Sequence, residues 1–317
     1  MTGPIPHWPG RMVALGGARG EQVYLAETAG PGSGGGKEVV LCVHGMSGAA
    51  TNWTDFMAEL APAYDCKALD LPGSGFSPPP RSKAGYSVKS LAGTVIRLIE
   101  TLNLGPVHLA GNSMGGAVAI RAADARPDLV RTLTLISPVL PDLRVRRELL
   151  QFPLVALPVL GEWIMRRASL LPPENRVANV VATCYYDPGA VHPERFALEV
   201  AELRRRDGLG YAATALSMAA RTLVAETLRP RRHSLWQAAA RITVPALVIF
   251  GSHDRLVSPR LAAPAARAFR DGYVVVLPKT GHVAQMERPA LVAARFREMA
   301  DRTRKTGNAG RRDPVDA

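Results

Sequence analysis

Strand-like apolar runs that alternate with helix-like stretches are the feature that most limits how this chain can fold. Residues 38–43 read EVVLCV, a continuous run rich in β-branched side chains and typical of a strand buried on both faces. Similar runs recur, at RMVAL and QVYLA within the first 30 residues and at 64–71, 106–111, 129–137, 244–250 and 273–278. Helix-like stretches lie between them, as at 87–102 and 115–126. This alternation predicts an α/β fold with a mostly parallel, twisted sheet of about eight strands flanked by helices.

The alternation is interrupted between residues 139 and 241. That segment contains helix-like pieces broken by prolines and lacks a run comparable to VVLCV. We therefore expect an α/β core in two parts, 1–138 and 242–300, separated by a mostly helical cap at 139–241. The last residues, 301–317, are polar and are expected to form a frayed C-terminal tail.

The composition is that of an ordinary globular protein, and its positive charge does not indicate a nucleic-acid-binding protein. Hydrophobic residues make up 47% of the 317 residues and charged residues 21%. The net charge is +12, but no arginine stripe alternates with aromatic residues, and neither a zinc-finger nor an RNP-like motif is present. We expect no nucleic-acid partner, because a basic surface without such motifs favours anionic substrates or membranes.

Cysteine usage and the N-terminal sequence favour a cytoplasmic protein without a metal or an organic cofactor. Cys42, Cys66 and Cys184 lack metal-ligand spacing, and unpaired thiols fit a reducing compartment. The first residues do not show a basic segment followed by an apolar one, and no apolar run is long enough to span a membrane. No histidine pair has metal-ligand spacing, and no G-x-G-x-x-G motif opens a helix after a strand.

The motif GNSMGG at 111–116 lies where a strand should end and a helix should begin. Gly111 and Gly115 lack the Cβ atoms that would clash in so tight a bend. Ser113 is therefore expected in a strained conformation at the top of the sheet, next to a helix N-terminus that favours developing negative charge. The amide of Met114 would then donate to an oxyanion. The competing interpretation is a simple glycine-rich turn.

A serine hydroxyl needs a base and an orienting carboxylate to act as a nucleophile. Asp254 follows the strand-like run VPALVIF, and His282 follows YVVVLP. Since the carboxyl ends of parallel strands meet at one edge of a sheet, both side chains are expected beside Ser113. The order Ser, Asp, His along the chain is the one expected when the nucleophile sits on such a bend.

Three other residues compete for these roles. Asp142 also follows a strand-like run and is an alternative orienting acid. His253 is a weaker candidate for the base, because neighbouring residues at a strand end usually point in different directions. His108 lies inside the run PVHLA and is expected to be packed in the core.

A second oxyanion donor is expected from the loop after EVVLCV, where His44, Gly45 and Met46 follow the strand-like run. Gly45 lets the backbone turn so that the amide of Met46 can face the site. We expect His44 to support this loop by hydrogen bonding rather than to transfer protons. Asn112 is expected to support the bend beside Ser113.

Five motifs, taken in order, resemble those of the α/β-hydrolase superfamily: HGMSG (44–48), DLPGSGFSPP (70–79), GNSMGG (111–116), GSHDRLV (251–257) and GHVAQMERP (281–289). The resemblance implies Ser113 as nucleophile, His282 as base and Asp254 as orienting acid. It also implies the amides of Met46 and Met114 as the oxyanion hole. The inserted segment resembles the helical cap that covers the site in many members.

The resemblance also bears on the reaction. A serine at this bend argues against haloalkane dehalogenases and epoxide hydrolases, which use aspartate there. GNSMGG is similar to the motif of meta-cleavage-product hydrolases. Those enzymes, however, have more glycines after the early His-Gly and a Trp after the catalytic His, where this chain has Met46, Ser47 and Val283.

We therefore expect a serine hydrolase that cleaves a carboxylic ester through an acyl-enzyme. Its substrate should be a small to medium, largely apolar molecule. The alternatives are a C–C bond hydrolase of the meta-cleavage-product type and a haloperoxidase-like perhydrolase. Outside the enzymes, the alternative is a ligand-binding protein that kept the fold.

One apolar part of the inserted segment allows two interpretations. Residues 149–165 read LLQFPLVALPVLGEWIM, and four arginines flank them: Arg146, Arg147, Arg166 and Arg167. The first interpretation is a pair of cap helices whose apolar face lines the substrate cavity. The second is a surface that docks on anionic membranes or binds lipid-like esters.

Overall fold

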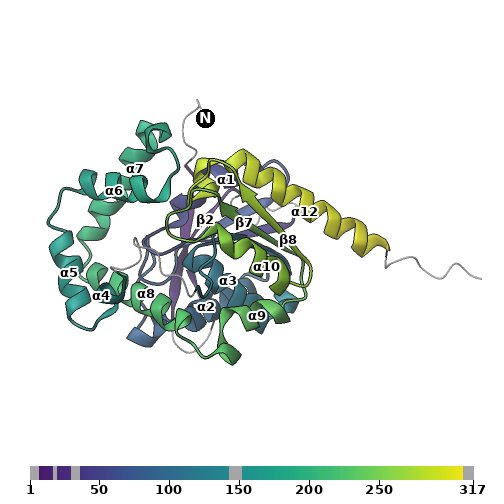
Figure 1. Cartoon of the computed structure of the whole chain (residues 1–317), viewed down its shortest axis with the longest axis horizontal. Helices are drawn as coiled ribbons and strands as arrows, with labels where there is room; N and C mark the ends of the chain where they lie inside the picture. The colour runs from purple at the N-terminus through teal and green to yellow at the C-terminus, as the bar shows by residue number, and fades with distance from the viewer. Residues whose placement is uncertain (1–6, 17–19, 30–35, 143–151, 310–317) are drawn as a thin grey trace, which may run out of the picture.

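Within residues 7–16, 20–29, 36–142 and 152–309, which this computed structural model describes, eight strands form one sheet (Figure 1). They are β1 (Gly10–Ala14), β2 (Gln22–Glu27), β3 (Val39–Val43), β4 (Asp65–Leu69), β5 (Val107–Asn112), β6 (Val130–Ile136), β7 (Ala246–Gly251) and β8 (Gly272–Leu277). Their order across the sheet is β1-β2-β4-β3-β5-β6-β7-β8. The pairs β1–β2 and β2–β4 are antiparallel and the others are parallel. The predicted α/β fold with a mostly parallel sheet is confirmed.

The central strands owe their continuous apolar sequences to helices on both faces of the sheet. Every residue of β5 and β7 is buried, whereas the edge strand β8 is largely half-buried. One face is covered by α2 (Val88–Thr101), α3 (Met114–Ala125), α9 (Leu235–Arg241) and α10 (Ala262–Ala268). The other is covered by α1 (Thr54–Leu60), α11 (Ala284–Glu287) and α12 (Pro289–Ala309). This arrangement leaves the carboxyl ends of the parallel strands free to carry loops.

Short 3-10 helices complete the connections of the described chain: Ala50–Trp53, Lys83–Tyr86, Pro127–Leu129, Pro188–Ala190, Arg231–His233 and Pro259–Leu261. A capping residue accounts for the start of α2, and a proline accounts for the end of α3. The hydroxyl of Ser87 accepts the amide hydrogen of Ser90 and so caps α2. Helix α3 ends before Pro127, which cannot continue it.

In the described part of the chain, six α-helices lie between β6 and β7. Five of them come before α9: α4 (Phe152–Ala156), α5 (Leu160–Ala168), α6 (Pro173–Cys184), α7 (Pro193–Asp207) and α8 (Ala212–Thr227). Figure 1 shows α4 to α7 in teal on the left, set apart from the sheet. Helix α9 also falls within the segment expected as a cap, but its apolar side chains share the core cluster of α3. Arg146 and Arg147 lie outside the described residues.

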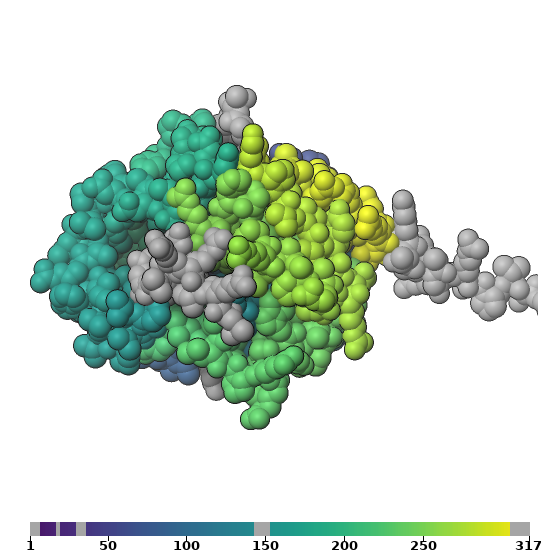
Figure 2. Space-filling view, viewed as in Figure 1, coloured from purple at the N-terminus to yellow at the C-terminus, as the bar shows by residue number. Residues whose placement is uncertain are grey.

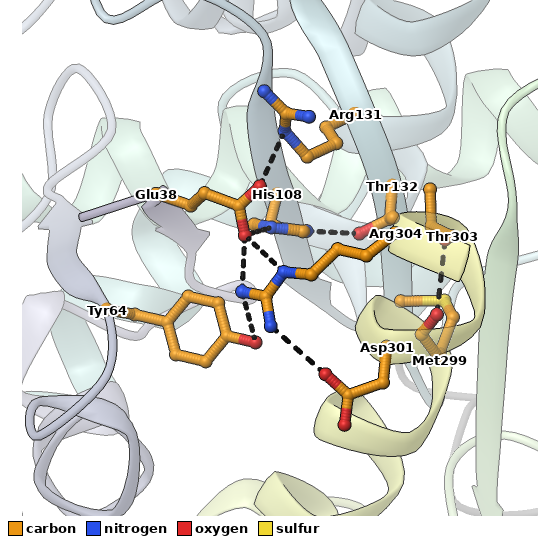
Figure 3. A network of polar contacts seen from close by, with 9 residues as sticks. All are labelled: Glu38, Tyr64, His108, Arg131, Thr132, Met299, Asp301, Thr303 and Arg304. Atoms are coloured by element: carbon orange, nitrogen blue, oxygen red, sulfur yellow. Dashed lines mark hydrogen bonds and ion pairs between the residues drawn. The ribbon is translucent and has the colours of Figure 1, made fainter. Parts of the chain in front are cut away.

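A polar network joins α12 to the sheet at the end opposite the catalytic motifs (Figure 3). His108 of β5 is buried, with Nδ1 2.8 Å from the hydroxyl of Thr132 and Nε2 3.4 Å from Glu38 Oε2. Arg304 of α12 donates from Nε to the same Glu38 oxygen at 3.0 Å and from Nη2 to the hydroxyl of Tyr64 at 3.3 Å. His108 is thus a buried residue, as predicted, but it also has polar partners.

The same network includes the C-terminal part of α12. Helix α12 continues to Ala309, and Arg304 holds it against the base of the sheet. Residues 301–309, expected as part of a polar tail, form the last turns of α12, and Arg304, which lies within them, forms an ion pair with Glu38. Residues 310–317 lie outside the described part of the chain. Among the described helices, none is long and apolar enough to cross a membrane.

Candidate active site

Ser113 occupies the sharp bend between the end of β5 and the start of α3. Its backbone has φ 55° and ψ −117°, in the positive-φ region that L residues rarely adopt. Two neighbouring glycines make the bend possible. A Cβ at Gly111 would lie 2.4 Å from Gly115 O, and a Cβ at Gly115 would lie 2.2 Å from Val43 O. The amide of Ser113 donates to Ile136 O at 3.0 Å, which fixes the bend to β6.

His282 and Asp254 form a buried pair at the same edge of the sheet. The imidazole Nδ1 of His282 lies 2.9 Å from Asp254 Oδ2, while Asp254 Oδ1 accepts the amide hydrogens of Leu256 and Val257 at 2.8 and 2.9 Å. Burial opposes ionisation of Asp254, yet its pKa lies below the ordinary value because the imidazole and the Val257 amide favour the charged form. A carboxylate beside Nδ1 directs that proton inward and leaves Nε2 able to accept another.

Asn112 connects the serine bend with the histidine loop. Its Nδ2 donates to Ile136 O at 3.0 Å and to His282 O at 3.1 Å. Residues from three strand ends are thereby held together, although Ser113 and His282 are far apart in the sequence. The side chains of Ser113 and His282 line the same cavity. The sequence marked Asn112 as a supporting residue but contained no sign of these two partners.

His44 holds the loop that follows β3. Its Nε2 accepts the amide hydrogen of Leu71 at 3.0 Å, so Nδ1 carries the proton and donates to Gly45 O at 2.7 Å. Burial lowers the pKa of His44 to about 4, which keeps the ring neutral near pH 7. A ring engaged at both nitrogens is suited to support the loop. A Cβ at Gly45 would lie 3.1 Å from Ser113 Cβ, so this backbone packs directly on the serine.

The amides of Met46 and Met114 come from the two loops that surround Ser113. Met46 lines the cavity, and Met114 is the first residue of α3. Within the described part of the chain, neither amide donates to another protein group. An N–H at a helix N-terminus also carries the positive end of the helix dipole. The two donors are therefore available to a negatively charged oxygen.

Two acidic residues that sequence reasoning did not assign organise these loops. Asp70, directly after β4, accepts the amide hydrogen of Ala50 at 2.6 Å and that of Phe76 at 2.8 Å. Burial raises the pKa of Asp70 to about 6, against the effect of these two hydrogen bonds. Its position at the start of DLPGSGF was the only available signal, since the two amides lie on different loops.

Glu287 is the second such residue, and it lies in the motif GHVAQMERP. Its Oε2 accepts the amide hydrogen of Gly281 at 2.7 Å, and its Oε1 accepts that of Tyr186 at 3.0 Å. The amide of His282 donates to Cys184 O at 2.6 Å. The histidine loop is therefore joined to the end of α6 from both sides.

Neither alternative candidate for the acid or the base, Asp142 or His253, belongs to the His282–Asp254 pair. Asp142 is on the cavity wall, while Nδ1 of His282 faces Asp254. His253 is exposed and packs against Tyr186, with ring centroids 4.5 Å apart. Among the described residues, no group of three or more His, Cys, Asp or Glu side chains could hold a metal ion.

A cavity of about 640 Å³ lies between the sheet edge and the helices that precede β7. Ser113 and His282 line it from the sheet side, and side chains of α5, α6, α7 and α8 line it from the other. Most contributions from α6, α8 and the residue that follows α8 are apolar: Val177, Val180, Val181, Leu223, Val224 and Leu228. In Figure 2 the teal helices and the yellow-green end of the chain occupy opposite sides of this face of the molecule.

Comparison with known proteins agrees with this architecture. Residues 38–289 match the family model described as alpha/beta hydrolase fold. The dihydrolipoyllysine-residue acetyltransferase component of the acetoin cleaving system of Cupriavidus necator is 31% identical over 80% of this chain, which spans 61% of that relative's length. The pimeloyl-[acyl-carrier protein] methyl ester esterase of Neisseria meningitidis is 26% identical over 83% of this chain and 76% of its own.

A solved structure has a similar fold. The 2-hydroxy-6-oxo-6-phenylhexa-2,4-dienoate hydrolase of Rhodococcus sp. strain RHA1 superposes with a TM-score of 0.72. The alignment covers 92% of this chain and 100% of that one, at 19% identity. At this level of identity the similarity concerns the fold alone.

Proposed function

This chain belongs to the alpha/beta hydrolase fold family, and from that premise we propose that it is a serine hydrolase of carboxylic esters. Ser113 is the nucleophile, His282 the general base and Asp254 the acid that orients it. The amides of Met46 and Met114 form the oxyanion hole. The substrate is a small to medium ester with a largely apolar part. Helices α4 to α8 form the cap of this site, and the core resumes at α9.

The geometry suggests the following reaction. Ser113 Oγ attacks the ester carbonyl while its proton passes to His282 Nε2, and the carbonyl oxygen becomes an oxyanion that accepts hydrogen bonds from the two amides. The imidazolium then gives the proton to the leaving alcohol, which departs and leaves an acyl-enzyme. A water molecule, deprotonated by His282, attacks the acyl group. The acid is released and Ser113 regains its proton.

One observation carries this proposal: a strained, glycine-framed serine and a buried His–Asp pair line one largely apolar cavity. The combination of a serine at φ 55° with a buried His–Asp pair on the same cavity favours catalysis over ligand binding alone. The depressed pKa of Asp254 supports a charged carboxylate at neutral pH, which is the state that stabilises an imidazolium.

Ester turnover by the wild-type protein and by Ser113→Ala tests the proposal. We expect the wild type to hydrolyse p-nitrophenyl butyrate and octanoate, and the variant to lose a factor of roughly 10⁴ or more in kcat. A fluorophosphonate should label Ser113 and no other serine. The enzymatic role of this site is wrong if both proteins turn over the esters equally slowly.

The alternatives use the same three residues and differ in the substrate. A vinylogous 1,5-diketone hydrolysed much faster than any ester would indicate the C–C hydrolase. Halogenation of monochlorodimedone that depends on a carboxylic acid and peroxide would indicate the perhydrolase. Both assays belong beside the ester series, with Ser113→Ala as the common control.

A further inference from the structure

One wall of the cavity carries most of its acidic and basic side chains. Helix α7 lines the cavity with Arg195, Glu199, Glu202 and Arg206, which we call the charged wall. Their spacing of four, three and four residues places them along one face of the helix. The side chains contributed by α6 and α8 are mostly apolar, so a bound molecule would meet an apolar side and a charged side.

Two residues of the charged wall have acidic or basic partners of their own. Arg195 forms a buried ion pair with Asp55 and also donates to Thr51 O at 3.1 Å. Glu202 accepts from Arg205 Nε at 2.9 Å and from its Nη2 at 2.6 Å. These pairs are electrically neutral and leave little hydrogen-bonding capacity for a ligand.

Glu199 and Arg206 are different. Among the described residues neither has an ion-pair partner within salt-bridge distance. Glu199 Oε1 accepts one long hydrogen bond, 3.4 Å, from Asn52 Nδ2. Arg206 Nη1 donates to Ser47 O at 2.9 Å, but its buried Nε has no partner. The cavity wall therefore holds an acceptor and a donor that still have hydrogen bonds to make.

The charge balance decides what kind of group fits there. Both existing pairs are neutral, and Glu199 and Arg206 together also sum to zero. A ligand carboxylate would satisfy Arg206 but would face Glu199, and an ammonium group would face the opposite conflict. A neutral group that both donates and accepts hydrogen bonds is repelled by neither residue. A hydroxyl or a diol is such a group. Burial raises the pKa of Glu199 and lowers that of Arg206, in agreement with a site of low polarity around them.

The position of the two residues relates them to the reacting carbonyl. Ser47, which accepts from Arg206, directly follows Met46, the proposed oxyanion donor. Asn52, which donates to Glu199, belongs to the 3-10 helix that continues the same loop. An ester held at this loop would have one arm at the charged wall and the other among the apolar side chains.

We propose that the preferred substrate is an ester with one apolar arm and one arm that carries hydroxyl groups, and that Glu199 and Arg206 bind those hydroxyls. The inference rests on the proposed ester hydrolase function and adds the substrate class. A polyol monoester, such as a monoacylglycerol of medium chain length, has this chemistry.

The test compares kcat/KM for matched octyl and octanoyl compounds. Two are hydroxylated, 1-octanoylglycerol and octyl glycerate, and they place the hydroxyls on the alcohol and the acyl side respectively. Methyl octanoate lacks the hydroxyls, and monomethyl suberate carries a carboxylate. We expect one hydroxylated ester to exceed methyl octanoate roughly tenfold or more, since a hydrogen bond to a charged group is worth about that factor.

Variants assign the preference to the two residues. Glu199→Gln and Arg206→Met should each lower the ratio of kcat/KM for the hydroxylated ester to kcat/KM for methyl octanoate roughly tenfold. Glu298→Gln and Arg167→Met, which alter exposed residues outside the cavity, are the matched controls. A variant that merely misfolded would lose both substrates together.

Binding without turnover gives a second readout. In a Ser113→Ala background, the uncleavable ether 1-octylglycerol should raise Tm, and adding Glu199→Gln should abolish that shift. If p-nitrophenyl octanoate is hydrolysed but the hydroxylated esters show no advantage, or monomethyl suberate is preferred, the substrate class is wrong and the hydrolase function stands. If no ester is turned over through Ser113, both proposals fail.

Discussion

At the level of single residues, the position of Ser113 depends on its backbone conformation and on the neighbouring glycines. Ser113 keeps its positive φ because β5 and α3 enter the bend from fixed directions and because glycines remove the obstructing atoms. Holding a serine in such a conformation costs on the order of 1–3 kcal/mol. Burial of the surrounding strand ends offsets that cost.

Buried histidines at two ends of the sheet make the stability of the fold depend on pH. Burial lowers the pKa of His44 and of His108 to about 4 from 6.5. The unfolded chain therefore binds these protons near pH 6.5 and the folded chain only near pH 4, so stability falls as the pH drops through this window. Asp70 acts in the opposite direction, because burial raises its pKa from 3.8 to about 6.

The pKa shifts of His44 and His108 together affect the stability more than the opposing shift of Asp70. The free energy of unfolding is therefore expected to fall by about 3 kcal/mol between pH 7 and pH 4.5. Urea denaturation at the two pH values measures it. His108→Asn, which removes one of the two groups, should make the dependence on pH much weaker. Stability that stays constant or rises toward pH 4.5 would contradict these pKa assignments.

At the scale of elements, the helices before β7 are tied to the histidine loop through hydrogen bonds to α11. Glu287 accepts amide hydrogens from Gly281, next to His282, and from Tyr186, just after α6. A displacement of α6 would therefore be transmitted to the loop that carries the base. Glu287 touches no reacting atom and acts as a positioning residue.

Glu287→Gln retains one amide acceptor and places an NH2 group against the other donor. We expect kcat on p-nitrophenyl esters to fall roughly tenfold with a change in KM below about threefold, because misplacement of a catalytic group affects the chemical step. The pH profile of kcat should shift, which a purely structural loss would not produce. Glu298→Gln, which breaks only an exposed pair with Arg295, is the control and should behave as wild type.

At the scale of the whole molecule, exposed apolar side chains gather on the outer side of α4 and α5. Val159 is 80% exposed, Trp163 55% and Leu157 46%. Arg167 lies over the ring of Trp163, 5.6 Å from its centroid, and Arg166 is exposed beside it. Met165 and Ala168 of the same helix α5 line the cavity. Contact of this surface with anionic membranes, which the sequence raised as a hypothesis, stays a prediction.

Co-sedimentation with vesicles tests that hypothesis. Binding should be stronger to phosphatidylglycerol-containing vesicles than to phosphatidylcholine alone. The double variant Arg166→Glu, Arg167→Glu should weaken it roughly tenfold or more, since each basic residue near the surface contributes about 1 kcal/mol. Arg231→Glu with Arg232→Glu, a pair of exposed arginines outside α4 to α8, is the control. Equal binding to both kinds of vesicle would reject the hypothesis.

Features that depend on neighbouring residues could be predicted from the amino-acid sequence. Alternating buried strands and helices indicated the parallel sheet, and GNSMGG indicated a bend at Ser113, because backbone sterics act within a few residues. The five motifs were enough to recognise the family. Asp254 and His282 could be proposed because parallel strands bring their carboxyl ends to one edge.

Features that depend on residues far apart in the chain became visible in the folded molecule. The fold placed Asp254 rather than Asp142 against His282, carried α12 to Ala309, and packed α9 on the core. It also joined Glu287 to Tyr186 and left Glu199 and Arg206 facing the cavity without ion-pair partners among the described residues. Hydrogen bonds and ion pairs between residues far apart in the chain leave no periodic or local signal, so they become visible only when the chain is folded.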